Sequence, residues 1–280
     1  MEFHRLGSLL HRRDIDQSKH LQQQLSTGIK SSAYGQKSWL SLFALFYARL
    51  TNELHQTKHK VSCCLLCQGT TQQHPLICPH CQADIQYFEL EKIDHNLLHW
   101  PAIASHINHQ HFEQLICLAP HQWPLSTWLS ALKYQQRFEL ADLIAFLLAS
   151  RLKASLHVSS NTVLTAVPIH IERWQERGFN QSHLIAKALA NYLSITYQPM
   201  LLAKEKVTQP QVGLSGAERR KNVKNSFVVT QPKLVSMSPD IVLFDDVITT
   251  GSTANEACKT LKLGGANKIT VVSATLAPPS

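Results

Sequence analysis

Two adjacent aspartates, Asp245 and Asp246, follow the apolar residues 241–244, which predict a buried strand with the two acids at its carboxyl end. A short turn at 249–253 comes next and leads into an expected helix. In an open α/β sheet, ligands bind where strand ends and helix amino termini meet. The turn can offer N–H groups and hydroxyls to one phosphate, and Gly251 lets the backbone approach it closely. The carboxylates need a polyol or a metal ion, so a sugar phosphate satisfies both demands.

The alternative for these residues is a buried strand with a polar exit turn and a capped helix. Two neighbouring carboxylates, however, are costly to bury without a partner. The stretch 241–253 resembles the phosphoribosyl-pyrophosphate (PRPP) signature of type I phosphoribosyltransferases. This resemblance implies that Asp245 and Asp246 hold the ribose hydroxyls, with Mg²⁺ nearby, and that the turn holds the 5′-phosphate. The turn residues are Thr249, Thr250, Gly251, Ser252 and Thr253.

A second anion-binding loop is expected after a strand at 162–167. Residues 169–178 are interpreted as a loop that carries Arg173 and Arg177 towards the amino terminus of a helix. Arginine side chains and the first N–H groups of a helix both bind phosphate oxygens. Pyrophosphate is the natural occupant, because it must lie one sugar's width from the first phosphate.

A long basic segment, residues 204–225, separates two expected hairpin arms at 201–202 and 227–229. Six lysines and arginines against two glutamates give the segment a net charge of +4. A long excursion between strands is usually functional or disordered. The functional interpretation is a lid that closes on pyrophosphate, with Arg219 among its charges.

Four cysteines form paired Cys-x-x-Cys knuckles, Cys64 with Cys67 and, after ten intervening residues, Cys78 with Cys81. Two such turns can close a tetrahedron of thiolates around Zn²⁺. The pattern predicts structural zinc, which would stabilise a segment too small to have its own core. The alternative is four reduced thiols in a loop. Other candidate ligands nearby are Cys63, His74 and His80.

The chain has 280 residues, 44% of them hydrophobic, and a formal net charge of +8. These values predict a globular protein with anionic partners, either nucleic acid or a polyphosphate metabolite. No apolar run approaches the roughly 18 residues that a membrane-spanning helix needs. The start of the chain lacks a signal-peptide pattern. We therefore expect a cytoplasmic protein without a membrane span.

The alternation of expected strands and helices predicts an α/β fold with a mainly parallel sheet flanked by helices. A small four-cysteine zinc module is expected to precede this phosphoribosyltransferase-like domain. The predicted division of the chain is a mobile polar extension at 1–38, an amphipathic helix at 39–60, the zinc module at 61–85, a linker at 86–110 and the domain at 111–280.

From about residue 60 to its end, the chain resembles the ComF family of competence proteins, which includes GntX-like members. The blocks that carry the resemblance are the double Cys-x-x-Cys motif, Leu132-Lys133-Tyr134, Arg177-Gly178-Phe179-Asn180-Gln181, Arg219 with Asn222, and the acidic signature. It implies a zinc finger joined to a type I phosphoribosyltransferase domain and a role in natural transformation. It also implies that Arg177 and the basic segment face pyrophosphate.

The first functional hypothesis is a protein that handles incoming single-stranded DNA with PRPP as ligand or cosubstrate. The resemblance implies a cytoplasmic position, peripheral at the inner face of the membrane, and a competence helicase or recombination mediator as partner. Single strands need stacking platforms. Tyr134, Trp174 and Phe179 are candidates, with core packing as the alternative for each. The basic residues Lys133, Arg137, Arg151 and Lys153 are either solvated helix charges or a basic face for a polyanion.

The second hypothesis is an active phosphoribosyltransferase of nucleotide metabolism with an unidentified acceptor. Purine enzymes of the hypoxanthine-guanine type carry an Asp where this chain has Thr249, so the proton-handling carboxylate for a purine is absent. Transfer to another acceptor stays open. A third interpretation is regulatory, with PRPP only sensed.

Overall fold

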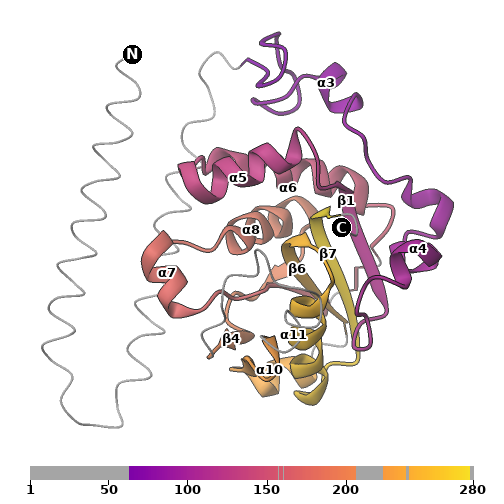
Figure 1. The fold of residues 1–280 in the computed structure, drawn as a ribbon, viewed down its shortest axis with the longest axis vertical. Coiled ribbons are helices and arrows are strands. Elements are labelled where there is room, and N and C mark those ends of the chain that lie inside the picture. Colours follow the sequence, from indigo (N-terminus) through magenta and orange to yellow (C-terminus); the bar gives the residue numbers. More distant parts are fainter. Residues whose placement is uncertain (1–62, 157, 160, 206–222, 238–239, 278–280) are drawn as a thin grey trace, which may run out of the picture. The chain divides into compact units, whose positions relative to one another are not determined.

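The structure is a computed structural model that describes residues 63–156, 158–159, 161–205, 223–237 and 240–277 (Figure 1). The predicted polar extension at 1–38 and amphipathic helix at 39–60 lie outside these residues. Arg219 and most of the basic segment also lie outside them. Among the described residues, no helix combines the length and apolar character that crossing a bilayer requires.

A five-stranded sheet forms the centre of the described chain, with the strand order β1-β7-β6-β2-β3 and parallel pairing throughout. Its strands are β1 (Gln114–Pro120), β2 (Val163–Ala166), β3 (Thr196–Tyr197), β6 (Asp240–Ile248) and β7 (Lys268–Leu276). The interior strands β6 and β7 are buried over most of their length. Strands of parallel sheets that are covered on both faces are typically such continuous apolar runs.

Helices flank this sheet (Figure 1). The longer ones are α5 (Leu125–Gln135), α6 (Glu139–Leu152), α8 (Gln181–Leu193) and α11 (Ser252–Leu263). Helix α6 packs against α8, α8 packs against β2 and β6, and α11 packs against β6. The predicted mainly parallel sheet flanked by helices is confirmed.

The predicted hairpin arms pair as an antiparallel ribbon of β4 (Leu202–Lys204) and β5 (Phe227–Val229). A short helix, α10 (Pro232–Met237), follows β5 and precedes β6.

The interpretation of residues 169–178 as a loop is wrong in one respect, because the segment contains a helix, α7 (Ile171–Arg177). The His170 side chain accepts a hydrogen bond from the N–H of Glu172 at its start, and Gly178 ends it with a φ of 82°. None of its residues is buried. The helix therefore lacks the apolar stripe by which sequence periodicity reveals a helix.

The segment predicted as a linker, 86–110, contains three short helices: η1 (Leu90–Ile93), η2 (Leu97–His99) and α4 (Pro101–Ala104). Its Leu90, Leu97 and Ile107 are buried in the same core as the sheet. The Asn96 side chain fixes it to β1, since its amide donates to the Glu113 carbonyl and its oxygen accepts from the N–H of Leu115 at 3.0 Å. The division of the chain into domains stays a prediction.

Two glycines with positive φ allow a matched test of this packing. A Cβ at Gly251 (φ 69°) would lie 2.8 Å from Ile107 Cγ2 and 3.0 Å from the Asn108 carbonyl oxygen, whereas a Cβ at Gly178 would meet nothing within 4 Å. We expect Gly251→Ala to lower the free energy of unfolding by roughly 3 kcal/mol, and Gly178→Ala by roughly 1 kcal/mol. Urea denaturation of both variants measures this difference. Equal losses would contradict the tight packing at Gly251.

Candidate functional site

A cavity of about 480 Å³ lies where β2 and β6 end. It is lined by Asp245, Asp246, all of residues 249–253 and Arg177. The predicted ligand-binding residues therefore meet in one place, with Arg219 outside the described chain. Lys204, from the basic segment that was expected to face pyrophosphate, also lines it. Lining groups that the sequence interpretation did not assign to this site are His121, Lys133, Gln181 and Ser182.

The sequence prediction put the two aspartates at the carboxyl end of a strand, and in the structure they lie within β6, three and two residues before its end at Ile248. The reason is the neighbouring strand β7, which pairs with β6 as far as Ile248. On the other side, β2 pairs with β6 only as far as Phe244. The β2 edge of β6 is therefore unpaired from Asp245 onwards, and the cavity opens there.

Asp246 is 5% exposed, so its carboxylate depends on partners inside the protein. Lys133 Nζ forms an ion pair with its Oδ2, and Gln181 Nε2 donates to its Oδ1 at 3.2 Å. The Ser182 hydroxyl donates to the same Oδ1 at 3.3 Å. Burial alone would raise the pKa of Asp246, but Lys133 and these donors hold it below its ordinary value. Asp246 is therefore the charged member of the pair.

Asp245 has the opposite electrostatic environment. Burial raises its pKa to about 7, and repulsion by the Asp246 carboxylate adds to the increase. Its Oδ1 accepts the N–H of Asp246 at 3.0 Å. Hydroxyl donors or a divalent cation in the cavity would stabilise the charged form of this carboxyl group. The pair is therefore suited to a polyol or a metal ion.

The turn after β6 presents the amino terminus of α11 to the cavity. Gly251 is the N-cap and has no side chain that could satisfy the first N–H groups of the helix. The hydroxyls of Thr250 and Ser252 lie 2.8 Å apart. Asn108 braces the turn from outside, because its N–H donates to the Thr250 carbonyl at 2.9 Å. This combination of hydroxyls and a helix amino terminus suits one phosphate group.

Cationic side chains also line the cavity. Arg173 and Arg177 come from α7, and Lys204 comes from β4. Burial lowers the pKa of Lys204 to about 8, with Arg173 adding to the effect. A bound anion would restore the charged form of this lysine. These three cations therefore give the cavity a group of side chains that can bind an anion.

Lys133 is the functional side chain that sequence reasoning misjudged. It was interpreted as a solvated charge or as part of a basic face for a polyanion, but it pairs with Asp246. Nothing in helical periodicity reveals such a partner, because the partner lies more than a hundred residues further along the chain. The signal that could have placed Lys133 and Gln181 at the site was their membership of the two sequence blocks, 132–134 and 177–181, that carry the family resemblance.

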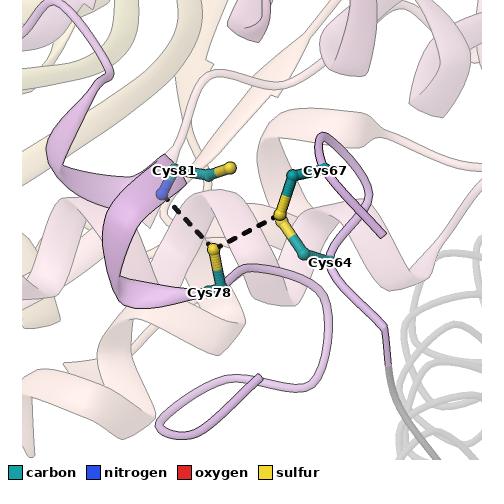
Figure 2. Close-up of side chains that lie close together, drawn as sticks. All are labelled: Cys64, Cys67, Cys78 and Cys81. Carbon is teal, nitrogen blue, oxygen red and sulfur yellow. Dashed lines mark hydrogen bonds between the residues drawn. The ribbon is translucent and has the colours of Figure 1, made fainter. Parts of the chain in front are cut away.

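The four predicted metal ligands form a second site. The Sγ atoms of Cys64, Cys67, Cys78 and Cys81 all lie within 4.8 Å of one another (Figure 2). Cys78 is the N-cap of the short helix α3 (Pro79–Ala83), and Cys81 lies within that helix. The sulfurs of Cys67 and Cys78 are 3.6 Å apart. Sulfurs of a tetrahedral zinc site are separated by about 3.8 Å, given a Zn–S bond of about 2.3 Å. The cluster therefore has the composition and spacing to hold a metal ion.

His74, an alternative ligand in the sequence analysis, has different partners. Its Nδ1 accepts the N–H of Leu76 at 3.1 Å, and its Nε2 lies 3.2 Å from Asp142 Oδ2 on α6. Its ring packs against Phe146 with centroids 5.0 Å apart. Asp142 also accepts the hydroxyl of Tyr192 on α8. His74 therefore joins the four-cysteine module to the helices beside the sheet.

The fold and the two sites define the class of this protein as a parallel α/β domain with a four-cysteine module. The chain is 29% identical over 222 residues to competence protein F of Haemophilus influenzae, and the aligned residues cover 78% of this chain and 91% of that protein. It is 28% identical over 221 residues to DNA utilization protein YhgH of Escherichia coli K12, and that alignment covers 74% of this chain and 87% of YhgH. These relatives confirm the resemblance to ComF competence proteins. No protein-family model matches the chain.

Solved structures give weaker likenesses. A glutamine PRPP amidotransferase from B. subtilis, complexed with ADP and GMP, has a TM-score of 0.32 and 19% identity over 47% of this chain, and the match spans only 25% of that chain. An adenine phosphoribosyltransferase from Leishmania tarentolae has a TM-score of 0.27 and 16% identity, covering 51% of this chain and 73% of that one.

Metal binding by the four cysteines predicts that substitutions of Cys67 and of Cys63 differ in their effect on metal content. We expect the purified protein to contain one zinc ion per chain and Cys67→Ser to lose it, because three thiolates bind more weakly than four. Cys63→Ser is the matched control, since Cys63 is exposed and outside the cluster, and it should keep the metal. Metal content by mass spectrometry, with proteolysis of residues 63–85 after chelation, measures both effects. Equal metal content in all three proteins would contradict the site.

The raised pKa of Asp245 predicts a pH-dependent stability. Between its ordinary value of 3.8 and about 7, the folded protein holds a proton on Asp245 that the unfolded chain releases. The contribution of Asp245 to the free energy of unfolding therefore falls as pH rises through this range. Asp245→Asn removes that fall, so its stability relative to wild type should increase on the order of 2 kcal/mol from pH 5 to pH 8.

Urea unfolding in magnesium-free buffer at several pH values measures this change. Asp240→Asn, at the other end of β6, is the matched control and should follow the wild-type profile. A parallel profile for Asp245→Asn and wild type would contradict the burial of an uncharged Asp245.

Proposed function

We propose that this protein is a ComF-like competence protein that binds PRPP with Mg²⁺ in the 480 Å³ cavity and handles incoming single-stranded DNA in the cytoplasm. The observation that carries the proposal is the meeting of Asp245, Asp246, residues 249–253 and Arg177 in that one cavity. The names of its relatives, a competence protein and a DNA utilization protein, support the DNA role. The proposal also includes zinc as the metal of the four-cysteine module.

Each group of lining residues has a separate part in this function. Asp245 and Asp246 would accept the ribose hydroxyls, and the turn at 249–253 would donate N–H groups and hydroxyls to the 5′-phosphate. Arg173, Arg177 and Lys204 would neutralise pyrophosphate. When bound, Mg²⁺ supplies further charge neutralisation next to the carboxylates. Lys133 holds Asp246 in its charged form in the absence of ligand.

The charge of the chain supports binding of a polyanion. The formal net charge is +8, and contacts between basic side chains and phosphates give affinity that is independent of sequence and weakens with salt. The competence helicase or recombination mediator stays a prediction from the resemblance.

A second candidate function is transfer of the phosphoribosyl group to an acceptor. Asp245, with a pKa of about 7, can exchange a proton near neutral pH, as acid–base catalysis requires. Release of pyrophosphate from PRPP and Mg²⁺, assayed with a panel of acceptors and with or without single-stranded DNA, separates a transferase from a protein that only binds PRPP.

Thermal unfolding tests PRPP binding. With PRPP at about 100 times its Kd, the melting temperature of the wild-type protein should rise by about 5 °C or more in the presence of Mg²⁺. The double variant Asp245→Asn/Asp246→Asn should lose the rise, because neutral amides bind Mg²⁺ and ribose hydroxyls much more weakly than carboxylates. Asp240→Asn, on the same strand but outside the cavity, should keep it. An undiminished rise in the double variant would refute the assignment of the site.

A further inference from the structure

Three aromatic side chains were candidates for stacking on nucleic-acid bases, and the structure separates them. Phe179 is 4% exposed and packs edge-on against Phe138, with centroids 4.9 Å apart, so it belongs to the core. Trp174 is half-buried on α7. Tyr134 is 74% exposed, and its residue also lines the 480 Å³ cavity. Among the described residues, Tyr134 therefore combines an accessible ring with a position at the proposed PRPP site.

The surroundings of Tyr134 are suited to an aromatic anion. It lies in the last turn of α5, which ends at Gln135. The Arg177 guanidinium lies over its ring, 5.7 Å from the centroid. Aromatic rings and guanidinium planes are side-chain surfaces on which unpaired bases stack. The positive charge of the guanidinium also attracts the phosphates that flank a base.

Both neighbours of Tyr134 are connected to the same carboxylate. Arg177 Nη1 donates to Gln181 Oε1 at 2.6 Å, and Gln181 Nε2 donates to Asp246 Oδ1 at 3.2 Å. Lys133, adjacent in sequence, forms an ion pair with Asp246. The ring of Tyr134 therefore contacts, through Arg177, a hydrogen-bonded network that ends at Asp246. A base bound there would lie beside a sugar phosphate in the cavity.

We propose that Tyr134, with Arg177 over its ring, is a stacking site for a nucleobase at the rim of the cavity. The inference rests on the proposed function, which it deepens by naming the contact for the base. The base is supplied either by a single strand or as a free heterocycle, and the chemistry of stacking is the same in both cases. An exposed ring without a buried hydroxyl partner selects for a π-face and not for one base, which suits a strand of any sequence.

The fluorescence of 2-aminopurine tests this site, because stacking quenches it. Full-length protein is titrated into the free base in one arm and into oligothymidylate carrying one 2-aminopurine in the other. Quenching by the wild-type protein should persist in Tyr134→Phe, which keeps the ring. It should be lost in Tyr134→Ala, with the Kd for the oligonucleotide raised about tenfold. The arm that responds identifies the source of the base.

Trp123→Ala is the matched control. Trp123 is 69% exposed but does not line the cavity, so its removal should leave the quenching unchanged. Absence of quenching in both arms, full quenching by Tyr134→Ala, or equal loss in Tyr134→Phe and Tyr134→Ala would each overturn the proposal.

The thermal shift of the wild-type protein with PRPP and Mg²⁺ is measured on the same preparation. A shift without quenching defeats the stacking site and leaves PRPP binding intact. Quenching that depends on Tyr134 without a shift supports the stacking site and defeats PRPP binding.

Discussion

Two neighbouring carboxylates in β6 repel each other and lose part of their hydration. Side chains around the cavity offset this electrostatic cost. Lys133, Gln181 and Ser182 all contact Asp246 and keep its pKa low, whereas Asp245 has a pKa of about 7. The protein thus holds one stable negative charge and one that a ligand can stabilise. An arrangement that burial alone would disfavour is expected at a functional site.

Several separate pieces of chain hold this arrangement in place. The strand β7 pairs with β6 beyond the point where β2 stops, which keeps the acids within the sheet and leaves one edge open. The segment 86–110 supplies Ile107 and Asn108 against the turn at Gly251. His74 connects the four-cysteine module to α6 through Asp142. The site is therefore positioned by residues far from it in sequence.

The sequence predicted the sheet, the acidic strand with its turn, and the cysteine cluster, because each depends on local apolar runs or on fixed spacing. It missed α7, whose seven residues bury no side chain and so carry no helical stripe. It also misjudged Lys133, since the ion pair with Asp246 joins positions on α5 and β6 that only the folded chain brings together. Segment 86–110 contains no long periodic pattern, yet Leu90 and Leu97 are buried. Local patterns thus revealed the elements, while contacts between distant residues required the structure.

The central claim is that the carboxylates of β6 and the turn after it bind one sugar phosphate together. A crystal structure of the protein grown with PRPP and Mg²⁺ measures this directly. We predict ribose hydroxyls within hydrogen-bonding distance of Asp245 and Asp246, and the 5′-phosphate at the N–H groups of residues 250–253. PRPP bound at another surface, with the cavity holding only water, would contradict the account.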